Sequence, residues 1–294
     1  MTRIAFIGLG NMGSGMAANQ AKAGREVVAF DLSADALARA KEQGMSAASS
    51  AAEAVKNANV VITMLPAGQH VRAVYMDAIL PNAPKDALLI DCSTIDVDSA
   101  RTVGRDASMQ GFRSADAPVS GGTAAANAGS LTFMVGCREQ DFADIEAALK
   151  PMAKAIIRAG DSGTGQAAKI CNNMLLGISM IGVSEAFALA ESLGLEGQKF
   201  FDIASQASGQ CWSLTSYCPW PGPVPAAPSN RDYEGGFAAA MMLKDLKLAQ
   251  EAAETSGAPT PLGGAAMMLY DELVQRGAAS KDFSYILQML RGRL

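Results

Sequence analysis

One lysine stands inside a stretch that otherwise has the composition of a buried helix. Residues 163–173 read GTGQAAKICNN, and no further charged residue follows Lys169 until Glu185. On a helix, Lys169 and Asn173 are four residues apart and share a face, with Asn172 beside them. Burial disfavours the ammonium form and would lower the pKa of the lysine, so Lys169 could donate and accept a proton near neutral pH. The alternative is that Lys169 extends its ammonium group to solvent near the helix start.

A glycine triplet near the N-terminus could hold the phosphates of a dinucleotide. The stretch IAFIGLGNMGSG contains G-x-G-x-x-G directly after an apolar strand pattern, and a helical pattern follows it. In this motif the glycines permit a tight turn, let backbone approach the pyrophosphate and let the helix pack on the sheet, while helix N–H groups face the phosphates. The predicted phosphate loop consists of Gly8, Leu9, Gly10, Asn11, Met12 and Gly13.

Asp31 indicates which dinucleotide this loop would bind. It ends the second apolar run, EVVAFD, about twenty residues after the glycines, where an acid bonds the adenosine ribose diol. Because a carboxylate repels a 2′-phosphate, we expect NAD rather than NADP, although Arg25 or Arg39 could weaken this preference. A glycine-rich turn without a ligand is the alternative, and the complete strand, turn, helix, strand and acid unit favours NAD binding.

Three further loops follow apolar runs. In an open α/β sheet, ligands lie at the carboxyl ends of strands, so we expect Leu65, Pro66 and Thr94 beside the nicotinamide half of the cofactor. Plain loop residues at strand ends would look the same. In DAPVSGG, Ser120, Gly121 and Gly122 offer a hydroxyl and backbone N–H groups that could cradle a carboxylate, or they form a flexible turn of small residues.

Composition excludes several other classes of function. His70 is the single histidine, so a Ser-His-Asp triad or a zinc site built from imidazoles lacks residues, and we expect no metal. A net charge of -5 argues against a nucleic-acid surface or an anionic membrane surface and favours a small-molecule partner. No uncharged apolar run is long enough for a membrane span. Five cysteines without a CxxC pair fit free thiols in a reducing compartment, so we expect a cytoplasmic protein.

The chain divides into two parts near residue 163. Before it, seven short apolar runs alternate with helical patterns, which predicts parallel βαβ units and a Rossmann-type dinucleotide-binding domain over residues 1–163. After it, strand patterns end, and residues 164–294 are predicted to form an all-α domain that starts with a long interdomain helix. Residues 217–233 contain five of the twelve prolines, so we expect an ordered or gated loop there.

Four separated motifs together resemble the β-hydroxyacid dehydrogenase family. They are GLGNMGSGMA, DAPVSGGTAAANAGSLTFMVG, GTGQAAKICNN and MMLKDLKLAQEAA, and the resemblance spans essentially the whole chain. It implies a Rossmann-type domain followed by an all-α domain similar to the C-terminal domain of 6-phosphogluconate dehydrogenase. It also implies NAD-dependent chemistry on a small hydroxyacid and a homodimer or homotetramer.

The resemblance implies a role for several residues already considered. Lys169 matches the catalytic lysine of the family, as general base and general acid, and Asn173 matches the asparagine that orients the substrate. The loop from Ser120 to Gly122 matches the substrate-carboxylate loop. Imine-reducing relatives replace the lysine, so its presence favours alcohol chemistry.

Residues of the second half gain roles from the resemblance alone. Lys244 matches a lysine near the cofactor, with Asp245 beside it, and Trp212 and Phe237 resemble pocket walls against a short branched acid. Residues 208–237 are most similar to relatives that oxidise 3-hydroxyisobutyrate to methylmalonate semialdehyde in valine breakdown. Serine-oxidising relatives and tartronate semialdehyde reductases are alternatives within the family. The alternative of another class is a dinucleotide-binding protein without turnover.

Overall fold

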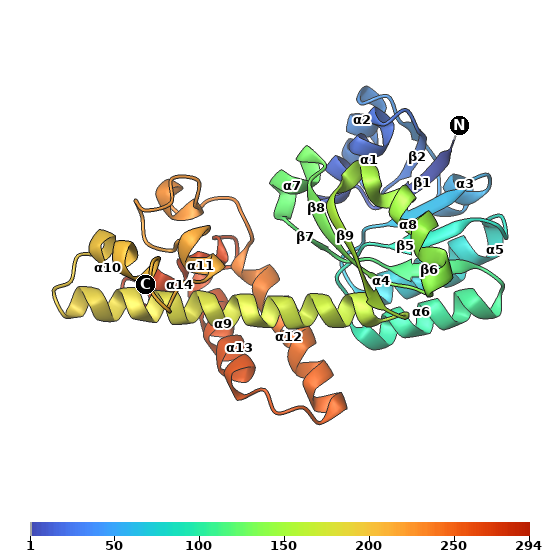
Figure 1. The fold of residues 1–294 in the computed structure, drawn as a ribbon. Coiled ribbons are helices and arrows are strands. Elements are labelled where there is room, and N and C mark those ends of the chain that lie inside the picture. The colour runs from blue at the N-terminus through green and yellow to red at the C-terminus, as the bar shows by residue number, and fades with distance from the viewer. Residues whose placement is uncertain (1) are drawn as a thin grey trace. The chain divides into compact units, whose positions relative to one another are not determined.

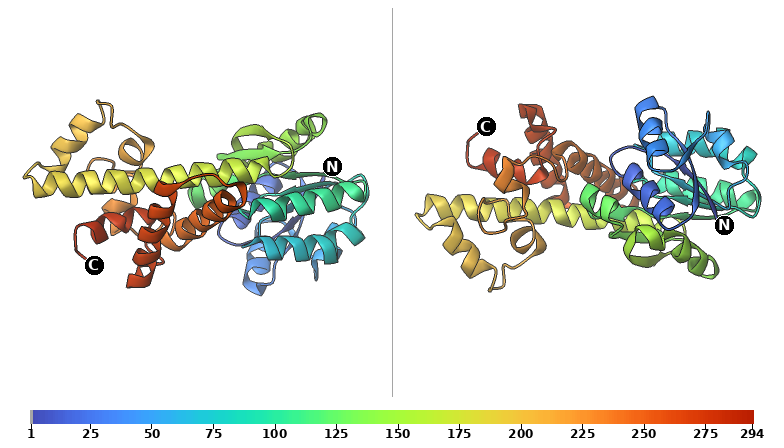
Figure 2. Two further views of the ribbon diagram at one scale, coloured as in Figure 1. Left: turned by 90° about the horizontal axis from the view of Figure 1, so that it is seen from below. Right: turned by 90° about the horizontal axis from the view of Figure 1, so that it is seen from above.

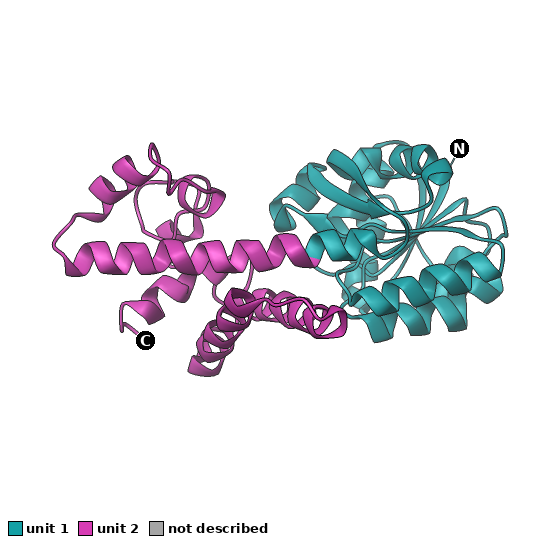
Figure 3. Cartoon of the chain, turned by 60° about the horizontal axis from the view of Figure 1, so that its bottom comes forward, with its two compact units in different colours: residues 1–169 teal, residues 170–294 magenta. Residues whose placement is uncertain are grey.

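The computed structural model describes residues 2–294 and divides the chain into two compact units. Unit 1 comprises Met1–Lys169 and unit 2 comprises Ile170–Leu294 (Figure 3). The division lies within one helix, α9 (Thr164–Ser192), whereas the sequence analysis places the domain boundary before this helix. Each unit is described by itself below.

Unit 1 is built around a nine-stranded sheet. Strands β1 to β6 are all parallel and follow the order β3-β2-β1-β4-β5-β6, which is the order of dinucleotide-binding folds. The strands are β1 (Arg3–Ile7), β2 (Glu26–Phe30), β3 (Ser46–Ala47), β4 (Val60–Thr63), β5 (Leu88–Asp91), β6 (Arg113–Asp116), β7 (Val119–Ser120), β8 (Leu131–Gly136) and β9 (Ala153–Gly160). The predicted Rossmann-type fold is therefore confirmed.

Three details of the sheet differ from the prediction. The sequence pattern predicts parallel units, but β8 runs antiparallel to β6 and β7. The run FRSADAPVS forms two strands rather than one, and Pro118 lies between them, where a residue without an N–H group interrupts the ladder. The two-residue strand β3 was not predicted, because it is too short for an alternating pattern.

Alternation along the strands explains why the sheet is covered on both faces. In β1, Ile4 and Phe6 point into one hydrophobic cluster, and Ala5 and Ile7 point into the other. Helices α1 and α2 flank the first face, and α4 and α6 flank the second (Figure 1). The helices of unit 1 before α9 are α1 (Gly13–Lys22), α2 (Ala34–Glu42), α3 (Ala51–Val55), α4 (Gly68–Val74), α5 (Leu80–Asn82), α6 (Val97–Met109), α7 (Gly122–Ala128) and α8 (Phe142–Leu149).

Unit 2 contains helices and no strand among the described residues after 169, so the predicted all-α fold is confirmed. The side chains of Met180, Met242, Tyr270 and Phe283 lie in its main hydrophobic cluster. Figure 2 shows these helices in two further views. Besides most of α9, unit 2 has α10 (Gly197–Ala204), α11 (Trp212–Thr215), α12 (Ala239–Ser256), α13 (Pro261–Leu273) and α14 (Ile286–Leu290).

The apolar composition of α9 suggests a helix that is buried on every side, but one side of it is exposed. Cys171, Leu175, Gly182 and Leu189 are exposed, and Leu175 and Leu189 are 63% and 59% exposed. These residues recur at helical spacing and form one apolar stripe along α9. By length and composition alone α9 could also cross a membrane, which the sequence analysis did not expect, but core helices of soluble proteins pass the same test.

The proline-rich segment 217–233 is irregular apart from one short 3-10 turn at Pro228–Arg231. The Ser229 hydroxyl donates to the Cys218 carbonyl at 2.8 Å, and the Tyr233 hydroxyl donates to the Pro219 carbonyl at 2.8 Å. These bonds close the segment on itself, so it is an ordered loop.

The buried carboxyl of Asp91 ends β5 in the core of unit 1. Its Oδ1 accepts hydrogen bonds from the hydroxyls of Thr63 and Ser93, each at 2.6 Å, whereas Oδ2 has no partner among the residues that the structure describes. Burial raises the pKa of Asp91 to about 6, the hydrogen bonds from Ser93 and Thr63 oppose this, and Asp116 adds a smaller increase. The folded chain therefore binds a proton more tightly here than the unfolded chain does.

We predict that Asp91 makes the free energy of unfolding fall as pH rises through roughly 4 to 6, because the folded state binds more protons in that window. In Asp91→Asn, a neutral amide removes this dependence while one oxygen still accepts hydrogen bonds. The free energy of unfolding of the wild type minus that of the variant should decline by up to about 3 kcal/mol as pH rises from roughly 4 to 6. Urea unfolding at several pH values measures it, with the exposed Asp77→Asn as control. Equal pH dependence in wild type and Asp91→Asn would contradict the prediction.

Candidate active site

The glycine loop after β1 has the geometry that a dinucleotide requires. Gly8 has a φ of +96°, and a Cβ there would lie 2.3 Å from the Met64 carbonyl oxygen. A Cβ on Gly13 would lie 2.0 Å from the Gly8 carbonyl oxygen, so the start of α1 packs directly on the loop. Nothing lies within 4 Å of the corresponding position on Gly10, which leaves its backbone open to a ligand. These three glycines therefore fit the pyrophosphate of the cofactor.

Asp31 lies directly beside this loop. Its Oδ2 accepts a hydrogen bond from the Leu9 backbone N–H at 2.6 Å, and its Oδ1 accepts one from the Ser33 N–H at 2.8 Å. The carboxylate is therefore held in one orientation at the end of β2, as a ribose ligand should be. Leu32, the next residue along the chain, is 95% exposed and was not among the predicted site residues.

Arg25 is engaged away from the Asp31 carboxylate. Its guanidinium donates to the carbonyl oxygens of Ala147 and Ala148 at 2.6 and 2.7 Å, at the C-terminal end of α8. Burial of the guanidinium lowers the pKa of Arg25. With these bonds made, Arg25 is not available to a 2′-phosphate, which removes one of the two residues that could have weakened the preference for NAD.

A hydrogen bond joins the loops after β4 and β5. The Leu65 N–H donates to the Ser93 hydroxyl oxygen at 2.8 Å. Pro66 is exposed and Thr94 is half-buried. The structure thus brings the two predicted nicotinamide loops together at the carboxyl edge of the sheet. His70, the single histidine, lies in the first turn of α4 and is exposed.

The Ser120 loop connects β7 to α7. Ser120 is half-buried at the end of β7, and Gly121 and Gly122 have φ values of +135° and +68°. A Cβ on Gly121 would lie 2.6 Å from the Ala125 Cβ, so a larger residue cannot adopt this turn. Backbone N–H groups can therefore approach an anionic oxygen here without an intervening side chain.

Lys169 lies in the second turn of α9 and is 7% exposed, so it does not extend into solvent as the alternative interpretation required. The first turn of this helix is held by the carboxylate of Asp116, at the end of β6. Asp116 Oδ1 accepts from the Gly163 N–H at 2.6 Å, and Oδ2 accepts from the Gln166 N–H at 2.8 Å. Burial raises the pKa of Asp116, while these backbone hydrogen bonds oppose the increase.

In unit 2, Asp245 links two predicted site residues. Its Oδ2 accepts a hydrogen bond from the Asn173 amide at 2.5 Å, and its Oδ1 lies 3.8 Å from Lys244 Nζ. Asn173 is 2% exposed, and its Oδ1 accepts from the Asn172 amide at 3.0 Å. Burial lowers the pKa of Lys244, whereas Asp245 raises it. Asp245 of the KDL motif therefore contacts both the Asn173 amide and the Lys244 amine.

Trp212 and Phe237 are connected through a buried carboxylate. Asp282 Oδ2 accepts hydrogen bonds from the Tyr217 hydroxyl and from the Phe237 backbone N–H, both at 2.8 Å. Trp212 stacks on Tyr217 with a centroid separation of 5.0 Å, and Trp212 itself is 51% exposed. Asp282 therefore orders the positions of both predicted pocket walls.

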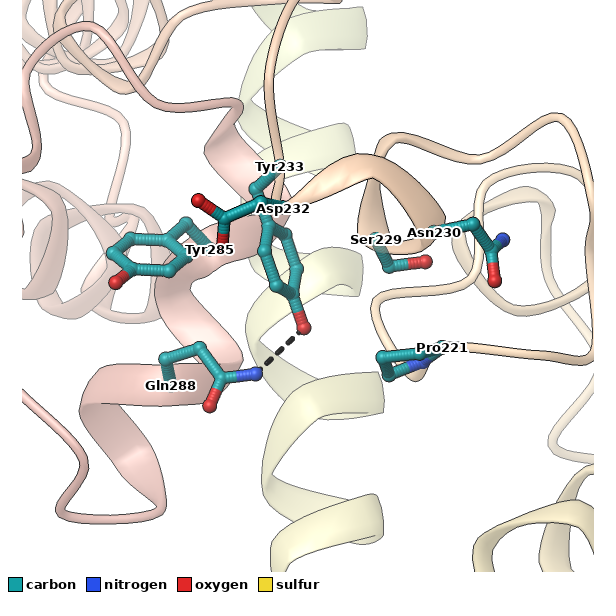
Figure 4. Close-up of a pocket in the computed structure, with 7 residues that line it drawn as sticks. All are labelled: Pro221, Ser229, Asn230, Asp232, Tyr233, Tyr285 and Gln288. Atoms are coloured by element: carbon teal, nitrogen blue, oxygen red, sulfur yellow. Dashed lines mark hydrogen bonds between the residues drawn. The ribbon is translucent and has the colours of Figure 1, made fainter.

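A surface pocket of about 490 Å³ lies elsewhere in unit 2 (Figure 4). Tyr233, Tyr285 and Gln288 contribute to its lining, and the Gln288 amide donates to the Tyr233 hydroxyl at 2.8 Å. The predicted substrate and cofactor residues are not among those that line it.

Four buried polar residues that organise these positions were not predicted: Asp91, Asp116, Gln166 and Asp282. Asp116 and Gln166 belong to the quoted motifs DAPVSGG and GTGQAAKICNN. A polar residue inside a buried segment is a signal that could have marked them, because such residues must find hydrogen-bond partners.

Comparisons with known proteins identify the family of the chain. Residues 3–160 match the family described as the NAD binding domain of 6-phosphogluconate dehydrogenase. Residues 163–290 match the family described as NAD-binding of NADP-dependent 3-hydroxyisobutyrate dehydrogenase. The chain is 47% identical to a Pseudomonas aeruginosa NAD-dependent L-serine dehydrogenase, over 98% of both chains. It is also 47% identical to a 3-hydroxyisobutyrate dehydrogenase from the same organism, over 100% of both chains.

A solved structure is similar over nearly the whole chain. The structure of Mycobacterium tuberculosis 3-hydroxyisobutyrate dehydrogenase with L-serine is 47% identical, covers 99% of both chains and has a TM-score of 0.96. The chain therefore belongs to the 3-hydroxyisobutyrate dehydrogenase family of β-hydroxyacid dehydrogenases and is a nicotinamide-dependent oxidoreductase that acts on the CH–OH group of a 3-hydroxyacid.

Proposed function

We propose that the chain oxidises 3-hydroxyisobutyrate to methylmalonate semialdehyde with NAD, as valine breakdown requires. The observation that carries this proposal is the burial of Lys169 in the second turn of α9, whose first turn is held by Asp116. A lysine withdrawn from solvent on a rigid element suits proton transfer at a defined atom. The proposed preference for NAD rests on the Asp31 carboxylate beside the glycine loop.

The residues of the chain divide the work of the reaction. The hydroxyl of Ser120 and the backbone N–H groups of Gly121 and Gly122 bind the substrate carboxylate, and Asn173 orients the substrate. Neutral Lys169 accepts the hydroxyl proton as the carbon–hydrogen bond at carbon 3 breaks, and it returns this proton to the carbonyl oxygen in the reverse direction. The bound nicotinamide supplies a hydride acceptor at C4. With no histidine in this role, positioning contributes much of the rate.

L-serine is the second candidate substrate. A relative named for L-serine oxidation is as similar to this chain as one named for 3-hydroxyisobutyrate, and the similar solved structure was determined with L-serine. A methyl group favours apolar walls, whereas an ammonium group needs polar partners. We propose that Trp212 and Phe237 supply apolar walls, which favours 3-hydroxyisobutyrate. None of the relatives named above is named for tartronate semialdehyde, so we do not propose that substrate. Because the chain belongs to a family of dehydrogenases, we also do not propose a dinucleotide-binding protein without turnover.

We further propose a homo-oligomer, either a dimer or a tetramer, in the cytoplasm. The apolar stripe of α9 that includes Leu175 and Leu189 supports a contact with a second copy, because exposed apolar surface of this kind is typical of interfaces. The five free cysteines are consistent with a reducing compartment.

We predict that kcat/KM for 3-hydroxyisobutyrate exceeds that for L-serine by about tenfold or more, because apolar walls leave the serine ammonium group without a partner. NADH or NADPH production is measured with both acids, each with NAD and with NADP. NAD should be preferred with either acid. If L-serine is the better substrate, the proposed roles of Trp212 and Phe237 are wrong, although the family assignment stands.

Replacing the proposed base provides the second test. Lys169→Ala should lower kcat by roughly 100- to 10,000-fold, the usual contribution of a general acid–base group. The dissociation constant of NADH, measured by its fluorescence, should stay within about twofold because Asp31 and the glycine loop are unchanged. Lys199→Ala on α10 is the control for loss of an ordinary lysine. Turnover near the wild-type rate in Lys169→Ala would remove this residue from its proposed role.

A further inference from the structure

Gln166 is a fully buried amide in the first turn of α9. It is 0% exposed and lies three residues before Lys169, so about one helical turn separates the two side chains. A buried amide must satisfy both its donors and its acceptor within the fold, so its partners are informative.

Both ends of the Gln166 side chain bond the backbone of the loop after β5. The amide nitrogen donates to the Ser93 carbonyl oxygen at 2.7 Å, and the Ile95 N–H donates to the amide oxygen at 3.1 Å. These two partners flank Thr94 on either side. The Gln166 side chain therefore holds the backbone on both sides of Thr94, which we propose to lie beside the nicotinamide.

The backbone of Gln166 is held as firmly as its side chain. Its N–H donates to Asp116 Oδ2 at 2.8 Å, while the Gly163 N–H donates to Asp116 Oδ1 at 2.6 Å. A Cβ on Gly165 would lie 2.4 Å from the Met134 carbonyl oxygen, so the first turn of α9 cannot move toward the sheet. Because the main chain is fixed, the side chain of Gln166 has one position from which it can reach Ser93 and Ile95.

We propose that Gln166 is a positioning residue that fixes the separation between the cofactor loop at Thr94 and the base Lys169. This inference rests on the proposed function, because it takes Lys169 as the base and Thr94 as a cofactor neighbour. Hydride loss and proton transfer occur on neighbouring atoms of the substrate, so both partners must be placed at once. A displacement of about 1 Å can lower such a rate by about 100-fold.

Only an amide meets both requirements at this position. A glutamate carboxylate can accept from the Ile95 N–H but places a second oxygen against the Ser93 carbonyl oxygen. A methionine fills a similar volume and leaves both backbone groups without their partner, which is costly for buried groups. Gln166→Glu and Gln166→Met therefore separate the loss of one hydrogen bond from the loss of both.

The matched control is Gln20→Met. Gln20 is also 0% exposed in unit 1, and its amide donates to a backbone carbonyl oxygen, that of Ala148, at 3.0 Å. It lies in α1 and contacts neither Ser93 nor Ile95. A loss of stability or activity that comes only from burying unpaired polar groups should appear in both methionine variants.

Three measurements test the proposal at a temperature where each variant is folded. The first is kcat with the better of 3-hydroxyisobutyrate and L-serine, together with the isotope effect of deuterium at carbon 3. The second is the dissociation constant of NADH. The third is hydrogen exchange of the Ile95 amide in the cofactor-free protein, which reports the loop without any turnover.

We expect Gln166→Met to lower kcat about tenfold or more, to raise the isotope effect and to speed exchange at Ile95. The dissociation constant of NADH should change by less than about threefold, because the glycine loop and Asp31 are intact. Gln20→Met should keep kcat within about twofold of wild type, whatever stability it loses. If Gln166→Met and Gln20→Met have equal kcat values and equal isotope effects, Gln166 is only structural and the proposal is overturned.

Gln166→Glu keeps the test decisive if Gln166→Met does not fold. Protonation of the buried carboxyl restores a donor toward Ser93, so the ratio of variant kcat to wild-type kcat should rise as pH falls. A ratio near one at every pH overturns the proposal. Failure of the proposed function is a separate outcome, because it appears as turnover in Lys169→Ala while Gln166 is unaltered.

Discussion

The buried carboxylate of Asp116 forms the hydrogen bonds on which the candidate site residues of unit 1 depend. It accepts hydrogen bonds from the N–H groups of Gly163 and Gln166, which have no partners within helix α9. Its negative charge also faces the positive end of the helix dipole. A Cβ on Gly136 would lie 2.4 Å from Asp116 Oδ1. The glycines at this junction are therefore required by the close approach of backbone to one carboxylate. Asp116 therefore fixes the start of the helix that carries Lys169.

The same segment of chain leads into the proposed substrate-carboxylate loop. Asp116 ends β6, and Ser120 follows four residues later at the end of β7, so one short stretch anchors the lysine helix and begins the carboxylate loop. In unit 2, the buried carboxylates of Asp245 and Asp282 have comparable tasks, because they hold Asn173 and Phe237 respectively. Buried carboxylates thus hold the elements and side chains to which we assign reactive and binding roles.

Much of the sheet was predictable because its signals are local. Seven short apolar runs marked the strands, and the three glycines with Asp31 marked the cofactor loop. What could not be predicted depends on residues far apart in the chain. The antiparallel direction of β8 and the partners of Gln166 follow from tertiary packing, which no pattern of spacing encodes. The exposed stripe of α9 was missed because an apolar composition does not reveal which face another element covers.

We propose that an anchored Lys169 exchanges the proton of the 3-hydroxyl group. A crystal structure of the complex with NADH and the 3-hydroxyacid tests it most directly, because reduced cofactor and alcohol cannot react with each other. We expect Lys169 Nζ to lie within about 2.6–3.2 Å of the hydroxyl oxygen. If another side chain contacts that oxygen while Lys169 faces away, Lys169 is not the base.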